Sequence, residues 1–184
     1  VDSIVSEDGD AKDLWRLWMD NGMPSHQIAN HRCMVSYGQS FGLALPAEMN
    51  GVPSARLRCL SPRRMAVEWD DAATDPYPSL ALESLSVDSE SEQWRLYDSE
   101  YVYWLATPAG GGDPVVHRVQ WHGAGVTPVV RFANNLDLDG NVIGEVTPFI
   151  PTAARINKTS YDRLLAQHFN SWKAVSYTHL RAHE

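Results

Sequence analysis

The sequence predicts an α+β fold with two N-terminal helices, a mostly antiparallel β-sheet and a long amphipathic helix. Three observations support this class. Apolar residues recur at helical spacing near both ends of the chain, they alternate with polar residues between Ser40 and Ala133, and proline, glycine and asparagine separate the alternating runs. Because 43% of the 184 residues are hydrophobic, the chain can form a packed core.

The first helix is expected from Asp10 to Asn21, followed by a stop at Asn21-Gly22. Its apolar residues at helical spacing are Ala11, Leu14, Trp15 and Trp18. A second helix is expected to begin at Pro24, because a first helical turn accepts proline, and to end at Gly38.

Alternating runs between residues 40 and 133 predict antiparallel strands. Their apolar positions are Phe41, Leu43 and Leu45, then Leu57 and Cys59, then Met65, Val67 and Trp69, and then Leu80, Leu82 and Leu85. Asp98-Ser99 separates the next two runs, which predicts a hairpin, and segments 115–121 and 128–133 predict two more strands. The glycine and proline loop 107–114 lacks the lysine and hydroxyl of a phosphate-binding loop.

The strongest helix signal covers residues 148–172. One face carries Tyr161, Leu164, Leu165, His168, Phe169 and Trp172, and Thr159 to Asp162 resembles a capping box with aspartate in place of glutamate. The helical pattern stops after Lys173, and the tail resembles a read-through string at the ends of broken metagenomic genes. We therefore expect one domain over residues 1–173, truncated at both ends, and a non-native tail over residues 174–184. His179 and His183, spaced like zinc ligands, lie in that tail.

The formal charge of −8 argues against a surface that holds DNA through its phosphates, so contact with nucleic acid should be weak or transient. No secretory signal or membrane-spanning apolar run is visible. With Cys33 and Cys59 as the two cysteines, we expect a cytosolic chain with reduced thiols.

The candidate metal ligands each have a simpler interpretation. Asp137, Asp139, Asn141 and Glu145 resemble the start of a calcium loop, but the glycine and the glutamate come too early, which favours a chain-reversing Asp-Gly turn. The cluster of His26, His31 and Cys33 holds one thiol and no CxxC pair, which favours a polar helix face over zinc. We predict no metal and no cofactor.

The candidate catalytic groups are also weak. Ser36, Ser40 and Cys33 have no nucleophile elbow or oriented base, and His117 and His122 flank a strand end. The carboxylate pairs Glu83/Asp88 and Glu90/Glu92 lie in a serine-rich acidic stretch that is typical of solvated surface. We predict no catalytic residue and no enzyme activity.

Aromatic residues alternate along the later strands, and they could form a stacking platform for sugars or single-stranded nucleic acid. The residues are Trp94, Trp104, Trp121, Tyr101 and Tyr103. Such a stripe is more often core or subunit interface, and no basic groove is interleaved with it in the sequence.

Five segments occur in the order found in SPP1-type phage portal proteins, especially those from phages of actinobacteria. They are LWRLWMDNGM, SYGQSF, LSPRRMAVEWD, PVVRFANN and GEVTPFIPTAARINKTSYDRLLAQ. The most specific feature is PVVRFANNLDLDG paired with a helix start that contains Ile150, Pro151, Arg155, Ile156 and Asn157. The resemblance covers nearly all of residues 11–173.

The resemblance implies a structural virion protein without catalysis. Such portals form a ring, usually of twelve subunits, at one capsid vertex, after assembly in the host cytoplasm. The ring contacts terminase, which hydrolyses ATP, as well as capsid or scaffold and head-tail adaptor proteins, and double-stranded DNA passes through it transiently. We expect the N-terminal wing of such a subunit, with Leu164, Phe169 and Trp172 packed on the sheet or the first helices.

Two other classes stay open. A carbohydrate-binding or tail-associated β domain would expose an aromatic face with no helix over it. A metal-assisted hydrolase would bring His117, His122 and an acidic residue together in a cleft.

Overall fold

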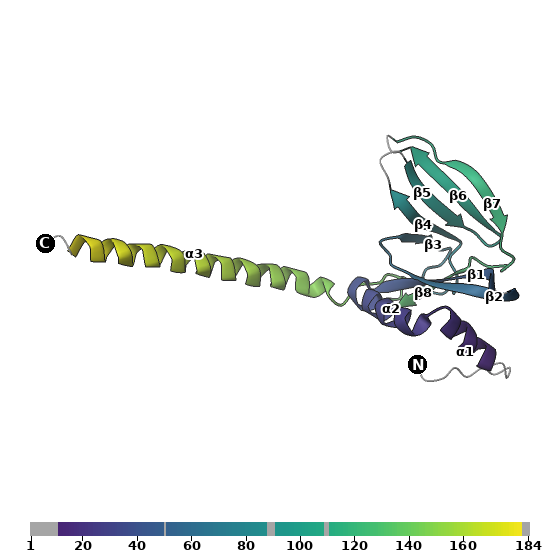
Figure 1. The fold of residues 1–184 in the computed structure, drawn as a ribbon, viewed down its shortest axis with the longest axis horizontal. Coiled ribbons are helices and arrows are strands. Elements are labelled where there is room, and N and C mark those ends of the chain that lie inside the picture. Colours follow the sequence, from purple (N-terminus) through teal and green to yellow (C-terminus); the bar gives the residue numbers. More distant parts are fainter. Residues whose placement is uncertain (1–10, 50, 88–90, 109–110, 182–184) are drawn as a thin grey trace. The chain divides into compact units, whose positions relative to one another are not determined.

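The computed structural model describes residues 11–49, 51–87, 91–108 and 111–181 (Figure 1). It has helices and two antiparallel sheets, which confirms the predicted α+β class. The chain divides into two compact units, Val1–Glu145 and Val146–Glu184. Asp10, the expected first residue of the first helix, lies outside the described residues.

The first unit begins with α1 (Ala11–Asp20) and α2 (Met23–Tyr37), close to the predicted bounds. Pro24 lies in the first turn of α2, where its missing N–H leaves no helical hydrogen bond unmade. Gly38 ends the helix at φ 85°, a conformation that glycine adopts without a Cβ clash.

A three-stranded sheet follows, with strand order β2-β1-β8. Its strands are β1 (Gln39–Met49), β2 (Val52–Leu60) and β8 (Val129–Ala133). The outer edge of β2 is covered in part by the Asn21 side chain, which accepts from Leu57 N at 2.9 Å and donates to Ala55 O at 3.0 Å. The amide thus takes the place of a neighbouring strand and satisfies edge groups that would otherwise need water.

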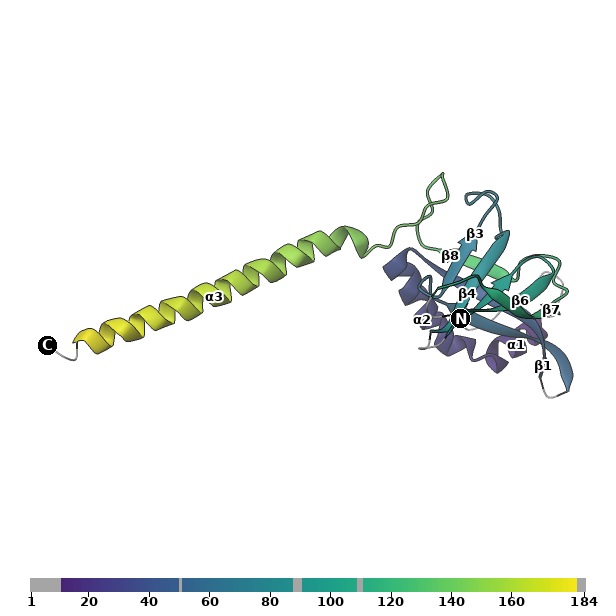
Figure 2. The same cartoon turned by 90° about the horizontal axis from the view of Figure 1, so that it is seen from above.

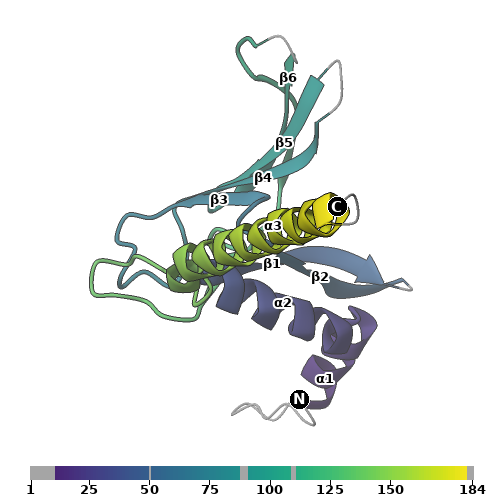
Figure 3. The same ribbon diagram turned by 90° about the vertical axis from the view of Figure 1, so that its left-hand side faces the viewer.

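The second sheet has five strands in the order β3-β4-β5-β6-β7. They are β3 (Met65–Glu68), β4 (Leu80–Val87), β5 (Ser91–Tyr97), β6 (Tyr101–Pro108) and β7 (Val115–Trp121). The predicted hairpin at Asp98-Ser99 is confirmed as the β5–β6 turn. Figure 3 shows α1 and α2 on one side of β1 and β2, with the five-stranded sheet on the other.

The core lies between the two sheets. Phe41, Leu43, Leu60 and Val129 come from the three-stranded sheet, and Met65, Ala81, Tyr97 and Val102 come from the five-stranded sheet. In β4 the alternation is the reverse of the expected one, because Ala81 and Glu83 point to the core while Leu80 and Leu82 lie on the opposite face. A period of two identifies a strand but not which of its faces is buried.

The second unit consists of a short 3₁₀ turn, η1 (Thr147–Phe149), and one long helix, α3 (Ile150–Arg181), drawn as a continuous helix in Figure 2. The helix begins at Ile150, with Pro151 in its first turn, so Thr159 to Asp162 lie in its interior and form no N-terminal cap. The predicted stop after Lys173 is also wrong, since the helix continues to Arg181. The expected non-native origin of residues 174–184 stays a prediction.

The packing of Leu164, Phe169 and Trp172 on the sheet or the first helices stays a prediction, because α3 belongs to a separate unit. Leu164 and Phe169 are 66% and 58% exposed, and Tyr161 is exposed beside them. The Trp172 side chain lies outside the described residues. The face has the expected amphipathic spacing, but burial requires a second apolar surface, and spacing along a helix does not specify that surface.

Candidate functional site

The most concentrated group of charges surrounds Glu83 of β4, which is completely buried. Arg58 of β2 donates to both carboxylate oxygens, from Nη2 to Oε1 at 2.6 Å and from Nη1 to Oε2 at 3.3 Å. Tyr97 of β5 donates its hydroxyl to Oε2 at 2.6 Å. A bidentate arginine and a phenol together satisfy a carboxylate that would otherwise be costly to bury.

Two further guanidinium groups lie near the same carboxylate. Arg95 Nη1 is 3.7 Å from Oε2, and Arg64 Nη2 is 4.0 Å from Oε1. Burial raises the pKa of the Tyr97 hydroxyl, and its hydrogen bond to Glu83 raises this pKa further, so the tyrosine is the proton donor of the pair. Glu83 therefore connects the two sheets through charge and hydrogen bonds at the edge of the core.

The interpretation of Glu83 as solvated surface is wrong. The serine-rich sequence around it suggested a loop, but β4 continues through Glu83 and directs it toward β2. Asp88 and Glu90 lie outside the described residues, and Glu92 is part of β5. Each carboxylate pair thus has one member outside the described residues, and the expectation that neither pair acts as acid and base stays a prediction. The arginine partners of Glu83 are too distant from it in the sequence for residue spacing to reveal them.

Glu83 belongs to a row that crosses four strands. Glu83 pairs with Arg95, Arg95 with Trp104, and Trp104 with Arg118. The Arg95 and Arg118 guanidinium carbons lie 5.5 and 4.4 Å from the centroid of the Trp104 ring, so the indole is in cation–π contact with both. Two arginines therefore flank Trp104, a contact that alternation along single strands did not reveal.

The opposite face of the five-stranded sheet carries the other aromatic residues. Trp121 is 66% exposed, and the rings of Tyr101 and Tyr103 are 6.2 Å apart and tilted. Trp94 and Tyr103 are half-buried. These residues come from neighbouring strands, so the sheet gathers them on one side, whereas Trp104 lies on the other side with the arginines. The aromatic stripe is thus divided between the two faces.

The NNLDLDG segment is a turn held by its own aspartate. Asp137 Oδ1 accepts from the backbone N–H groups of Asp139 and Asn141 at 3.0 and 2.7 Å, and Oδ2 accepts from the Asn141 side chain at 3.0 Å. The bonds from Asn141 and Asp139 hold the pKa of Asp137 below its ordinary value. Leu136 and Val142 form an antiparallel bridge, so the predicted chain-reversing turn is confirmed.

Arg131 of β8 fixes this turn in place, a role that the sequence did not suggest. Its guanidinium donates to Gly140 O at 3.3 Å and to Ala72 O, and its carbon lies 4.4 Å from the centroid of the Trp69 ring. Burial lowers the pKa of Arg131, although its two carbonyl acceptors suit the charged form. Arg131 therefore joins two loops that are distant in the sequence.

The histidines considered as candidates are either bonded to backbone groups or exposed at the surface. His122 Nδ1 accepts from Ala124 N at 3.2 Å, so Nε2 carries the proton that is shared with Asp98 O at 3.1 Å. His117 lies on the exposed strand β7, and His26 and His31 are exposed on α2. Within the described ranges, histidine, cysteine and acidic residues form no cluster of three that could hold a metal ion. His183 lies outside them, and the side chain of His179 is not described.

Among the residues that the structure describes, none of the candidate nucleophiles forms a hydrogen bond with a histidine or a carboxylate. Ser40 is buried in β1 and cannot reach a substrate, while Ser36 is exposed at the end of α2. The Cys33 thiol donates to Gln39 O at 3.8 Å, and burial raises the pKa of the Cys59 thiol, which makes Cys59 less reactive.

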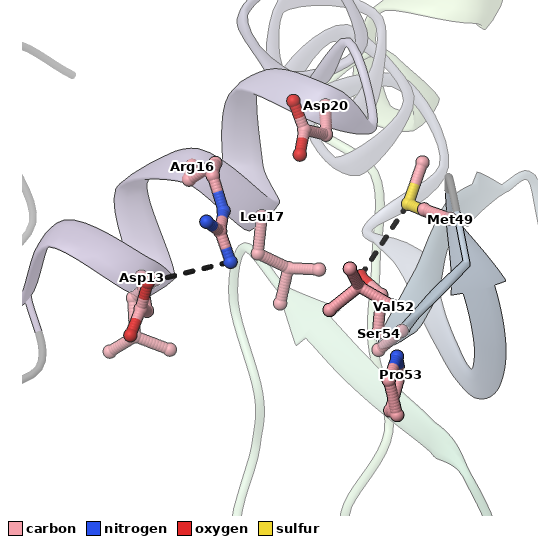
Figure 4. A pocket seen from close by; sticks show the side chains of 10 residues that line it. Asp13, Arg16, Leu17, Asp20, Met49, Val52, Pro53 and Ser54 are labelled. Atoms are coloured by element: carbon pink, nitrogen blue, oxygen red, sulfur yellow. Dashed lines mark hydrogen bonds and ion pairs between the residues drawn. The ribbon is translucent and has the colours of Figure 1, made fainter.

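A concave region of about 620 Å³ lies between α1 and the tip of the β1–β2 hairpin (Figure 4). Arg16 pairs with Asp13 at 3.5 Å, and Ser54 Oγ lies 3.5 Å from Met49 Sδ. The rest of the lining is mainly apolar, with Leu14, Leu17 and Val52. No nucleophile is oriented by a base here, so the region has the character of a contact surface rather than a reaction centre.

No helix in the described part of the chain has both the length and the apolar character needed to cross a bilayer. Comparison with known proteins gives one family match, to the model described as phage portal protein, SPP1 Gp6-like, over residues 3–180. No curated protein matches the sequence. The match covers nearly the whole chain and both units, in agreement with the resemblance carried by the five sequence segments. The chain therefore belongs to the SPP1 Gp6-like family of phage portal proteins, which has a structural role in the virion.

Proposed function

We propose that residues 1–173 form the wing of a portal subunit, and that copies of this subunit assemble into a closed ring at one vertex of the capsid. The family match over residues 3–180 carries the proposal. The order of two helices, antiparallel strands and a long helix, which the periodicity of the sequence predicted, is compatible with it. Residues 174–184 are proposed to be a non-native addition.

Ring closure requires that one surface of a subunit meets a different surface of its neighbour. The chain offers separate apolar surfaces for such contacts. One is the exposed face of α3 with Leu164 and Phe169, and another is the β7 edge of the five-stranded sheet with Val119 and Trp121. Their exposure supports burial in an assembly, because large apolar side chains gathered on a surface usually mark an interaction site.

The assembled ring would act as a conduit for double-stranded DNA during packaging and ejection. A formal charge of −8 favours this role, because a strongly basic wall would hold the phosphates through released counterions and slow the passage of DNA. In this proposal terminase hydrolyses ATP and docks on the portal ring. Capsid or scaffold proteins and a head-tail adaptor are the other partners, and assembly takes place in the host cytoplasm.

Two measurements test the proposal. Sequencing of the DNA on both sides of the coding region should show a large-terminase gene beside it. The protein encoded by the whole reading frame should then form closed rings in negative-stain electron micrographs. A monomer in sedimentation experiments at micromolar concentration, encoded far from any terminase gene, would contradict the portal ring.

A second function is favoured by one observation, the exposed Trp121 beside Tyr101 and Tyr103. A carbohydrate-binding or tail-associated β domain would use such rings to stack on sugars. Glycan-array binding that is lost in Trp121→Ala, by a protein that forms no ring, would favour this alternative over the portal.

A further inference from the structure

A small pocket of about 290 Å³ lies between the two sheets, beside the buried Glu83. Its lining combines two kinds of side chain: Arg56, Arg58 and Arg95 on one hand, and Leu43, Leu45 and Leu85 on the other. The strand register explains this combination. Arg56 pairs with Leu45 and Arg58 with Leu43 across β1 and β2, so each arginine lies beside a leucine on the face that meets the five-stranded sheet.

Among the described residues, the positive charges around this pocket exceed the negative ones. Arg58, Arg64 and Arg95 all approach the single carboxylate of Glu83, within 4.0 Å. Both oxygens of that carboxylate already accept hydrogen bonds from Arg58, and one also accepts from Tyr97. Glu83 can therefore balance one of the guanidinium groups well, while the others repel each other across a partly buried space.

Two of the pocket arginines retain unused donors. Arg95 Nε is buried and has no hydrogen-bond partner within the described residues, which is costly for a guanidinium N–H. Arg56 lines the pocket, is exposed and makes no ion pair within the same residues. A bound oxyanion would meet both needs, because guanidinium groups match the two oxygens of a carboxylate or phosphate.

The leucines decide between these anions. Leu43, Leu45 and Leu85 give the pocket an apolar wall, which suits an acidic side chain flanked by apolar ones. Duplex DNA is too wide for a pocket of this volume, and the net charge of −8 repels a polyanion.

We propose that this arginine pocket binds an acidic peptide segment of a partner protein, with a glutamate or aspartate carboxylate between Arg56 and Arg95 and an apolar neighbour on the leucines. The site rests on this geometry and does not depend on ring formation. The ligand class is an acidic and partly apolar peptide. The aromatic face and the α3 surface do not suit such a ligand.

The test uses the full chain and a capped pentapeptide of alternating leucine and glutamate, with a glutamine version of equal length as the uncharged probe. Binding is followed by titration at 50 mM salt and by the arginine Nε–H resonances in NMR spectra. We expect the glutamate peptide to shift the Arg95 Nε–H signal. We also expect Arg56→Gln to weaken binding by about threefold or more, in line with a single exposed charge pair.

Arg63→Gln is the matched control, since Arg63 is an exposed arginine that does not line the pocket, and it should bind the peptide as the unmodified chain does. The proposal is overturned if the glutamine peptide binds equally well, or if Arg56→Gln and Arg63→Gln behave alike. It is also overturned if inorganic phosphate or a DNA duplex shifts the Arg95 signal at concentrations where the glutamate peptide does not. Because Arg56 is exposed, its substitution leaves the Glu83 contacts intact and the fold testable.

Discussion

Glu83 illustrates how one buried carboxylate can hold several cations and two sheets together. Its oxygens accept from Arg58 and Tyr97, and Arg95 and Arg64 remain within 4.0 Å. Such a group adds little net stability when complete, since desolvation offsets much of the attraction, but its loss leaves buried cations without a partner. The effect of a substitution at this residue is therefore large and one-sided.

Glu83→Gln is expected to lower the free energy of unfolding by about 3 kcal/mol, because it removes the charge that balances Arg58 and Arg95. Urea unfolding followed by tryptophan fluorescence measures the change. Glu48→Gln, at an exposed position of β1, is the control and should shift stability by less than about 0.5 kcal/mol. Equal midpoints for the two variants would show that the Glu83 network is unimportant for stability.

Asp98 holds the turn between β5 and β6. Its Oδ1 accepts from Glu100 N at 2.7 Å and from Tyr101 N at 2.6 Å, and its Oδ2 accepts from the Tyr103 hydroxyl at 2.8 Å. Burial acts to raise the pKa of this carboxyl, but the hydrogen bonds from Tyr101, Glu100 and Tyr103 outweigh burial and keep the pKa below its ordinary value. The charged form is therefore the form that stabilises the fold.

Because the pKa of Asp98 is depressed in the folded state, its contribution is present above the unfolded pKa of about 3.9 and is lost as pH falls through the folded pKa. Asp98→Asn should cost about 1 kcal/mol at pH 7, a modest value because the group is partly solvated. The difference from the unmodified protein should shrink below pH 4. Asp113→Asn, in an exposed loop, is the control. A pH-independent difference would contradict this role for Asp98.

At the scale of elements, Gly38 connects α2 to β1 in a tightly occupied space. Its φ is 85°, and a Cβ there would lie 2.8 Å from the carbonyl carbon of Ile143. Asn134 N donates to Gly38 O at 2.9 Å, and Glu145 N donates to Val35 O at 2.9 Å, so the segment after β8 is fastened to the end of α2. One glycine thus allows α2, β1 and the last loop of the unit to meet.

Gly38→Ala is expected to destabilise the first unit by about 2 kcal/mol or more, since it adds a backbone clash to the cost of a positive φ. Gly125→Ala is the matched control, because Gly125 has φ 71° and no atom within 4 Å of its would-be Cβ. Gly125→Ala should lose only the roughly 1 kcal/mol that a positive φ costs an alanine. Thermal unfolding measured by circular dichroism compares them, and equal losses would mean that the close approach to Ile143 is relieved without cost.

At the scale of the whole molecule, the acidic charge sets the behaviour toward DNA. The chain has 23 acidic and 15 basic residues, and several arginines are occupied in the Glu83 cluster or on Trp104 and Trp69. The basic groups that remain are outnumbered by the acidic ones. The protein should differ clearly from DNA-binding proteins that use a basic face.

In fluorescence anisotropy with a labelled 20-base-pair duplex, we expect a Kd weaker than about 10⁻⁴ M at 150 mM salt, which is the weak end of non-specific binding. Binding should be weak because an acidic protein would release few counterions from the DNA. Low-micromolar binding with a steep salt dependence would contradict the idea of a wall along which DNA slides. A basic DNA-binding protein measured beside it serves as the positive control.

The sequence alone determined the class and order of the elements. Helical and two-residue periodicities are local properties of the chain, and for that reason α2, the β5–β6 hairpin and the turn at Asp137 could be predicted. The five ordered segments also pointed to the portal family, which the match over residues 3–180 shows. The start of α3 near Ile150 was also predicted, but its end at Arg181 was not, and Thr159 to Asp162 lie inside the helix because residues at cap-like spacing can equally occur there.

Only the tertiary structure decided which face of each strand is buried and which charges meet. Leu80 and Leu82 suggested one core face for β4, yet Ala81 and Glu83 are the residues directed into the core. The partners of Glu83 lie 25 residues away at Arg58 and 14 away at Tyr97, and Arg131 reaches Ala72 across 59 residues. Periodicity carries no information about which residues so far apart in the sequence will meet, since strand pairing and sheet packing are set by the free energy of the whole core.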